Sequence, residues 1–377
     1  MSAHLHALHA FRLPLQIPLV VGGQTLTERS GLFITLDDGH GARGVGEVAP
    51  LPGFHRATTA DCLALLRTHR TSLHNLSLPP LALHSAQGEG ETSACPPKPT
   101  GRRGDLLPFF PLPPLHFGLC MALLNLRAAR RGVTPAQLLD SAPLDFLPLN
   151  GLVMGPPDGW AAEVARCVDE GCRLVKVKVG RTDPRVEADA LLALPAALRD
   201  EVDFIVDGNR AWTLEQAAAF LARLAPLSPR YAEELLTDPT DLPELQARSG
   251  VAMALDETLA EPERYADLIR TWPSHLVLKL DTVPGSLATG LELAATARRR
   301  GQTAIISSAF NTVVGWSFLV QLGAALHAPH AGLDTQRCFA PALSGTPDGF
   351  CAGGIDVARS RVDDLDRLAP YLTEVPL

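Results

Sequence analysis

Polar residues able to do acid–base and metal chemistry recur at a regular interval through the second half of this 377-residue chain. Each ends or closely follows a short apolar run, and consecutive strands place them about 23 to 29 residues apart, the length of one strand–helix unit. In a β/α barrel the C-terminal ends of the strands meet at one mouth, where catalytic residues are placed. We therefore predict one site built from Lys176, Lys178, Asp207, Glu233, Asp256, Lys279, Ser307 and Ser308.

The three acids of this set predict a metal site. Asp207, Glu233 and Asp256 follow three consecutive apolar runs, and the set contains no His or Cys. Three carboxylates make a hard, all-oxygen site, which suits Mg²⁺, with Mn²⁺ as an alternative. A single acid of this kind more often caps a helix or pairs at the surface, but three in register beside lysines favour a metal site.

The segment LVKVKVG, residues 174–180, places two lysines on one face of an apolar strand. Side chains alternate along a strand, so Lys176 and Lys178 point away from the face that carries the three valines. A neighbouring ammonium group and partial burial should lower the pKa of a lysine, which would let it act as a general base. With Lys279 and a metal ion, the pair suits abstraction of a proton next to a carboxylate, because metal and lysine stabilise the enolate. An edge strand with solvated lysines is the alternative, and the valines disfavour it.

The elements that must position these residues form two regions. From about residue 146 onward, short apolar runs alternate with amphipathic helical stretches, in about eight units. This pattern predicts parallel strands with crossover helices, closed as a β/α barrel rather than an open sheet. Residues 1–60 read as β-structure, and helices are predicted at 57–75 and 116–132. The stretch 77–115 is rich in proline and reads as an insertion.

Gly39, Gly41 and Gly44 match the G-x-G-x-x-G pattern of dinucleotide-binding loops. That pattern needs a helix directly after it. The sequence that follows, VGEVAPLPGF, reads as extended and contains two prolines. We therefore predict a hairpin turn and no dinucleotide site.

The composition narrows the class of protein and its partners. The formal net charge of −8 argues against nucleic acid or an anionic membrane as a partner. No apolar run reaches the roughly 18 residues of a membrane span, and the N-terminus does not read as a signal peptide, so we expect a cytoplasmic protein. The seven cysteines include no zinc-type pair, and reduced core thiols are expected. The three histidines near the N-terminus are assigned no function.

In these residues the chain resembles the enolase superfamily, in its muconate-lactonizing branch, and within it the o-succinylbenzoate synthase family. The N-terminal segments PLQIPLVVGGQTLTERSGLFITL and GVGEVAPLPGF resemble that family's capping domain. The remaining segments follow in the family's order: VKVKVG, DGNRAW, YAEEL, LDETL, LVLKL, AIISSAFNTVVG and GLDT. The ordered set is specific, although each motif alone would be weak.

The resemblance implies a fold and its division into domains. The fold would be a (β/α)7β modified TIM barrel with an N-terminal α+β capping domain. The cap would occupy residues 1–115, including the proline-rich insertion at about 77–115. The barrel would occupy residues 116–335, and residues 336–377 would form a C-terminal segment that packs back on the barrel and cap.

The resemblance also implies a reaction and the residues that carry it. The family removes water, with syn geometry, from a cyclohexadiene carboxylate to give an aromatic ring. Lys178 would be the base and then the acid, Lys176 its electrostatic neighbour, and Lys279 a second stabiliser of the enolate. By position, the remaining residues would bind Mg²⁺ (Asp207, Glu233, Asp256), support the metal shell (Asn209) or hold the succinyl group (Ser307, Ser308, and the backbone near Gly332).

Some features depart from the family pattern, and other reactions use the same groups. Leu235 stands where the family has proline after its two acids, LKLDT replaces a lysine–proline pair, and 84–106 is an insertion. N-acylamino acid racemases and cycloisomerases share the lysines and acids. Dipeptide epimerases carry an Asp-x-Asp on the last strand, where this chain has only Asp334. A non-catalytic scaffold is a further alternative, and the protein is expected to be a monomer or homodimer acting on a small carboxylate.

Overall fold

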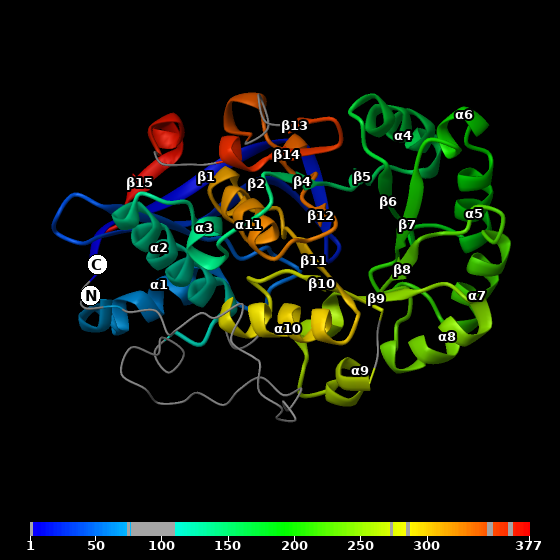
Figure 1. The fold of residues 1–377 in the computed structure, drawn as a ribbon, viewed down its shortest axis with the longest axis horizontal. Coiled ribbons are helices and arrows are strands. Elements are labelled where there is room, and N and C mark those ends of the chain that lie inside the picture. The colour runs from blue at the N-terminus through cyan, green and yellow to red at the C-terminus, as the bar shows by residue number, and fades with distance from the viewer. Residues whose placement is uncertain are drawn as a thin grey trace.

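The structure is a computed structural model that describes residues 3–73, 76, 110–271, 274–283, 287–344, 350–360 and 365–377. Most of the predicted insertion, residues 77–109, lies outside the described residues. The described part contains a four-stranded antiparallel sheet, an eight-stranded parallel sheet and a small third sheet. Figure 1 shows the N-terminal strands of the antiparallel sheet in blue at the left and centre of the view, and the parallel strands in green to orange from the centre to the right.

The eight-stranded sheet is the predicted barrel. Its strands follow chain order without interruption and every neighbouring pair is parallel. They are β5 (Gly151–Val153), β6 (Leu174–Lys178), β7 (Asp203–Asp207), β8 (Tyr231–Glu233), β9 (Met253–Leu255), β10 (His275–Leu278), β11 (Thr303–Ser307) and β12 (Ala331–Gly332). The intervening helices are α4 (Trp160–Asp169), α5 (Pro184–Leu192), α6 (Ala196–Arg199), α7 (Leu214–Arg223), α8 (Leu242–Ser249), α9 (Ala266–Thr271), α10 (Leu287–Arg299) and α11 (Val313–Ala325).

The seam between the first and last strands of the barrel is closed by few contacts. Leu149 forms a parallel bridge with Ala331, and the backbone N–H of Asn150 donates to the Ala331 carbonyl at 3.1 Å. Further along, the N–H of Leu152 donates to the carboxylate of Asp334 at 2.8 Å. A side chain thus replaces the backbone ladder at the mouth end of the seam. The seam brings the strands into the near-barrel that the sequence predicts.

The antiparallel sheet forms the capping region. Its order is β15 (Leu372–Glu374), β1 (His4–Val21), β2 (Gln24–Asp37) and β3 (Arg43–Val48). Strands β2 and β3 make a hairpin in which Asp37 pairs with Arg43. The prediction of a hairpin turn, with a strand and not a helix after it, is confirmed, although only Gly39 and Gly41 lie in the turn and Gly44 already belongs to β3.

Two helices lie beside this sheet: α1 (Thr59–Thr68), and α2 (Pro113–Arg131), which begins at the predicted border between cap and barrel. Thr58 starts α1 with a capping box, and Gly132, in a left-handed conformation, ends α2. Gly44 and Gly46 of β3 lie directly against the backbone of α2, where any Cβ atom would collide. The glycines therefore let helix and sheet pack closely.

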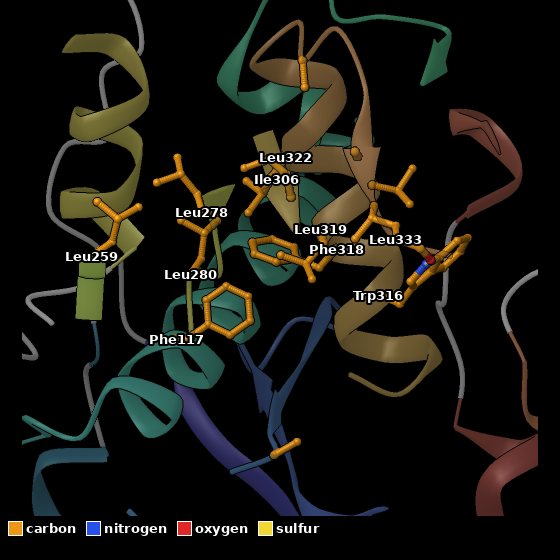
Figure 2. Close-up of a cluster of buried hydrophobic side chains, with 14 of the residues drawn as sticks. Phe117, Leu259, Leu278, Leu280, Ile306, Trp316, Phe318, Leu319, Leu322 and Leu333 are labelled. Carbon is orange, nitrogen blue, oxygen red and sulfur yellow. The ribbon is translucent and has the colours of Figure 1, made fainter. Parts of the chain in front are cut away.

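A common core joins the cap to the barrel. Phe117 of α2 makes an edge contact with Phe318 of α11, with 5.8 Å between ring centroids. Figure 2 shows these rings among Leu319, Ile306 and other buried side chains from the barrel strands and α11.

A short helix, α3 (Pro135–Leu139), leads to a small antiparallel sheet of β4 (Phe146–Pro148), β14 (Gly354–Asp356) and β13 (Phe350–Cys351). The chain then returns to the cap, where β15, red in Figure 1, pairs with β1.

Candidate active site

The predicted site residues meet at the C-terminal ends of the barrel strands. Lys178 is the last residue of β6 and is level with Asp207, the last residue of β7, which is level with Glu233 at the end of β8. Asp256 and Lys279 each follow the last residue of their strand, β9 and β10. The parallel register therefore places side chains from five consecutive strands in one layer at the barrel mouth.

The three acids lie together and are buried. Asp207, Glu233 and Asp256 each offer a carboxylate oxygen, and these oxygens all lie within 4.8 Å of one another. The exposed fractions of the three residues are 0%, 0% and 3%. Buried carboxylates at this separation repel one another unless cations lie among them. A hard divalent cation such as Mg²⁺ therefore fits this donor set.

Lys176 is the first cation among these acids. Its ammonium group donates to both oxygens of Glu233, at 2.9 and 3.1 Å, and lies 3.0 Å from Asp207. Burial favours the neutral amine, but the charges of Glu233, Asp207 and Asp256 outweigh it and raise the pKa of Lys176 well above its usual value. The lowered pKa expected from the sequence is wrong for Lys176, because the nearest charged groups are carboxylates and not the other lysine.

Lys178 lies nearer to solvent than Lys176. Its side chain is 16% exposed and its ammonium group donates to Asp207 at 2.5 Å and to Asn209 at 2.8 Å. Asn209 has a left-handed backbone, with φ of 43°, and its amide donates to Glu257 at 2.7 Å. Asn209 thus holds Lys178 from one side while Asp207 holds it from the other. The Asn209 N–H also donates to Asp207 at 3.2 Å, and its support of the metal shell stays a prediction.

Lys279 occupies the other side of the acids. Its ammonium group donates to Asp256 and lies 4.9 Å from the centroid of the Phe54 ring, which comes from the cap. The residue is 8% exposed. Burial opposes its charge, but the Asp256 and Glu257 carboxylates outweigh it and raise the pKa of Lys279. Lys178 and Lys279 therefore contact different carboxylates of the same acidic group, Asp207 and Asp256.

The sequence offers two adjacent acids at the end of β8, and the structure separates their surroundings. Glu233 lies in the acidic group, as predicted. Glu234 has a left-handed backbone, with φ of 41°, and accepts hydrogen bonds from the N–H groups of Asp256 and Thr258 at 2.9 and 2.8 Å. It also pairs with Arg210 at 3.1 Å. Glu234 therefore fixes the backbone that carries Asp256, a role that the sequence analysis missed.

The residues predicted to hold the succinyl group lie on the last two strands. Ser307 donates to the Gly332 carbonyl at 3.3 Å, and a Cβ atom at position 332 would lie 2.8 Å from the Ser307 hydroxyl. The Ser308 hydroxyl donates to the Asn311 side chain at 3.1 Å and accepts from the Asn311 N–H at 3.0 Å. Both of these hydrogen bonds of the Ser308 hydroxyl are made to Asn311, three residues further along the same loop. The substrate contacts of these residues stay predictions.

Phe54 is a site residue that the sequence analysis did not assign. It lies in the segment PLPGF, which carried part of the resemblance, but its ring has no chemical group that would single it out. Only the docking of the cap on the barrel places the ring against the Lys279 ammonium group. A cation close to an aromatic face is attracted by the ring quadrupole.

Comparison with known proteins now adds to this geometry. A family model described as Enolase C-terminal domain-like matches residues 159–349, just over half of the chain. The chain belongs to the enolase superfamily. A second model, described as MenC, N-terminal domain, matches residues 3–77 of this superfamily member, within the capping region.

Similar enzymes cover nearly the whole of this enolase-superfamily protein. The o-succinylbenzoate synthase of Vibrio cholerae is 29% identical over 346 residues, which are 88% of this chain and 89% of that protein. The o-succinylbenzoate synthase of Salmonella arizonae is 28% identical over 332 residues, 87% of this chain and 89% of that protein. The predicted resemblance to this family of lyases is confirmed, and the protein is an enzyme of the superfamily.

Solved structures confirm the fold. The L-Ala-D/L-Glu epimerase from Bacillus subtilis superimposes with a TM-score of 0.74 at 18% identity, over 89% of this chain and 91% of that chain. The N-succinyl Arg/Lys racemase from Bacillus cereus gives a TM-score of 0.76 at 15% identity, with both chains fully covered. At such low identity these similarities describe the fold alone. The predicted α/β barrel with a separate N-terminal cap is confirmed.

Proposed function

We propose that this protein is an o-succinylbenzoate synthase. It would remove water from 2-succinyl-6-hydroxy-2,4-cyclohexadiene-1-carboxylate to give o-succinylbenzoate, in menaquinone biosynthesis. The observation that carries the proposal is the similarity to o-succinylbenzoate synthases over both the cap and the barrel, with lysines and carboxylates meeting at the barrel mouth. As proposed, the enzyme works in the cytoplasm on this small carboxylate, without a nucleic acid or membrane partner. Among the described residues, no helix is long and apolar enough to cross a membrane.

Lys178 carries the proton in this proposal. Its neutral amine removes the proton from the ring carbon next to the substrate carboxylate, and the electron pair of that bond moves toward the carboxylate to give an enolate. Lys178, now an ammonium group, gives the same proton to the departing hydroxyl group on the same face of the ring. Water leaves, the ring becomes aromatic, and Lys178 returns to its neutral form. One residue that serves both steps accounts for syn geometry.

The acids and the other lysines set the electrostatics of this step. When bound, Mg²⁺ or Mn²⁺ at Asp207, Glu233 and Asp256 would supply positive charge for the developing enolate. Lys176, held between Asp207 and Glu233, adds a fixed positive charge beside Lys178. Asn209 orients the Lys178 amine through its 2.8 Å hydrogen bond.

Lys279 faces the substrate from the opposite side of the acids. Its ammonium group pairs with Asp256, and in the dehydration we assign it the role of a cation and not of a base. Phe54 covers it on the cap side, which limits access of water to this part of the site. The two strands that follow β10 end near Lys279 and carry Ser307, Ser308 and the backbone at Gly332. We assign the succinyl group of the substrate to the part of the site beside these residues.

The test is turnover of the cyclohexadiene substrate followed by ultraviolet absorbance. Protein with Mg²⁺ should convert the substrate quickly, and EDTA should stop the reaction. Restored turnover on adding excess Mg²⁺ would show that EDTA acts through the metal. A folded, Mg²⁺-binding protein that does not convert the substrate would refute the assignment.

Racemisation of N-acylamino acids is the second candidate. It is favoured by the placement of Lys178 and Lys279 on different carboxylates of one acidic group, because racemisation by two bases needs an amine on each face of the substrate. Lys279→Ala separates the two reactions. It should stop racemisation nearly completely, whereas a dehydration that uses Lys279 only as a cation should keep measurable turnover.

Dipeptide epimerisation is disfavoured by the surroundings of Asp334. This carboxylate accepts the Leu152 N–H at 2.8 Å and pairs with Arg166 at 3.2 Å, and the residue is 8% exposed. It is therefore used to close the barrel seam and is not free to bind the amino group of a dipeptide. The non-catalytic scaffold is set aside because the named relatives are enzymes.

A further inference from the structure

A loop of the cap, residues 50–56, reaches the barrel mouth and carries Phe54. The loop turns on itself, because the N–H groups of Phe54 and His55 both donate to the Leu51 carbonyl, at 3.1 and 2.9 Å. Gly53 has a left-handed backbone, with φ of 79°. These bonds shape the loop, but none of them attaches it to the barrel. One attachment comes from the His55 side chain.

The His55 imidazole lies buried between cap and barrel, with 3% of its side chain exposed. Its Nδ1 accepts the Leu51 N–H at 2.8 Å, which leaves the proton on Nε2. That Nε2–H donates to the backbone carbonyl of Asp281 at 3.2 Å and lies 3.9 Å from the Asp281 carboxylate. Burial lowers the pKa of His55 although the Asp281 carboxylate opposes this, which favours the neutral ring and this tautomer.

Asp281 lies two residues after Lys279, and the turn between them is closed. The N–H and the hydroxyl of Thr282 both donate to the Lys279 carbonyl, at 2.9 and 2.7 Å. On the other side, the Asp281 carboxylate accepts from the Asn311 amide at 3.1 Å. Asp281 is 4% exposed and Asn311 is 1% exposed. His55 is therefore bonded to a rigid turn that begins at a catalytic candidate.

Arg29 gives the loop a second attachment at its base. This buried residue of β2 donates to the carbonyls of Ala49 and Pro50, at 2.7 and 3.1 Å, and to the Phe310 carbonyl of the barrel at 3.0 Å. Arg29 fixes the start of the loop but does not reach Phe54. His55 directly follows Phe54 in the sequence, and the centroids of the two rings lie 5.5 Å apart. His55 is therefore placed to fix the Phe54 ring.

We propose that His55 is a positioning residue, whose hydrogen bond to Asp281 holds the cap loop and its Phe54 ring against Lys279 when substrate is bound. The inference rests on the proposed use of Lys279 in the reaction. It also gives a physical role to Asp281, which lies in the LKLDT segment that departs from the family pattern.

The experiment compares His55→Phe with His55→Gln. Phenylalanine keeps a ring but removes both hydrogen bonds, whereas glutamine can still donate to Asp281. His55→Phe should raise KM for the cyclohexadiene substrate about tenfold and leave kcat within about threefold, because the bond fixes the loop and does no chemistry. His55→Gln should restore most of the lost affinity. Equal KM values for wild type and His55→Phe would overturn the proposal.

Amide hydrogen exchange gives a readout that does not depend on the substrate. Residues 50–56 should exchange at least about tenfold faster in His55→Phe than in wild type. Unchanged exchange would overturn the anchoring role even if KM changed. If wild type does not convert the cyclohexadiene, the proposed function fails, and the exchange rates alone then decide whether His55 anchors the loop.

Two further variants keep the test decisive. His55→Ala removes the same hydrogen bond to the Asp281 carbonyl with a smaller side chain and should also speed exchange of the loop, which matters if His55→Phe folds poorly. His6→Phe is the matched control, since His6 also pairs with an aspartate of the cap, Asp37 at 2.9 Å, but its side chain is 37% exposed. Its KM and the exchange of the loop should equal those of wild type.

Discussion

The carboxylate of Glu47, in the cap, accepts the backbone N–H of Thr312, in the barrel, at 3.0 Å, although 265 positions separate the two residues. The same carboxylate accepts the Thr312 hydroxyl at 2.5 Å and the Gly315 N–H at 2.8 Å. Glu47 is 1% exposed and lies at the N-terminus of α11, where backbone N–H groups favour a negative charge. The cap thus supplies the carboxylate that caps the N-terminus of α11, a helix of the barrel.

Glu47→Ala should therefore destabilise the whole protein. Three donors at the start of α11 would lose their acceptor inside the interface, at a cost of about 2–4 kcal/mol in the free energy of unfolding. Denaturant unfolding followed by circular dichroism measures this loss. Glu28→Ala is the control, because Glu28 is 45% exposed and pairs with the exposed Arg12, so a change within about 0.5 kcal/mol is expected. Equal stability of both variants would contradict the role of Glu47.

Lys178→Ala should abolish turnover, by at least about 1,000-fold in kcat, since the proposed base and acid is removed. The fold and the affinity for Mg²⁺ should stay close to wild type, because the three acids remain. Steady-state kinetics and calorimetric Mg²⁺ titration check the two parts. Turnover like that of wild type would refute the role given to Lys178.

Asp207→Asn should weaken Mg²⁺ binding by at least about tenfold, because a negatively charged ligand becomes neutral. It should also release Lys178, whose ammonium group donates to Asp207 at 2.5 Å. Calorimetric titration with Mg²⁺ measures the affinity. Asp203→Asn, at the exposed start of the same strand, is the control and should bind as wild type does. If Asp207→Asn kept full affinity, the predicted ligand set would be wrong.

Addition of Mg²⁺ should raise the thermal stability of the protein. A cation at the buried acids binds the folded state alone, and a concentration of 100 times Kd stabilises by about 2.7 kcal/mol. A melting curve with Mg²⁺ should therefore lie above one with EDTA, and Asp207→Asn should show a smaller difference. Identical curves for wild type in Mg²⁺ and EDTA would count against the metal site.

Two histidines at the N-terminal ends of barrel strands, His275 and His330, should make the protein less stable in acid. Burial lowers the pKa of His330 to about 3 and that of His275 to about 4, and both rings stack with the Tyr231 ring. Their folded pKa values lie below the ordinary 6.5, so the unfolded state binds more protons once the pH falls below that value. Stability is then lost as the pH drops from about 6.5 toward 4.

His330→Gln should remove part of this pH dependence. Between pH 7 and pH 4, wild type should lose on the order of 1–2 kcal/mol more than the variant, after allowance for partial exposure of the ring. Urea unfolding at several pH values provides the comparison. His40→Gln, at an exposed position in the β2–β3 turn, should keep the wild-type pH dependence. Parallel curves for wild type and His330→Gln would contradict the assignment.

The sequence by itself determined the fold class and the composition of the site. Alternation in LVKVKVG placed Lys176 and Lys178 on the face of β6 opposite the valines, and the spacing of the acids matched the repeat of the barrel units. Both patterns are local, because side-chain alternation and the length of a strand–helix unit follow from the backbone. That is why Asp207, Glu233 and Asp256 could be predicted to meet before any coordinates were known.

Only the tertiary structure decided how the site residues act on one another. The pKa of Lys176 rises because Glu233 and Asp207 surround it, and such a charge balance depends on distances between separate strands. Glu234 was indistinguishable from Glu233 by residue type until its left-handed backbone turned it toward Asp256. The contact of His55 with Asp281 spans 226 positions and depends on how two domains dock. Pairings of this kind arise from packing of the assembled chain, and no local pattern encodes them.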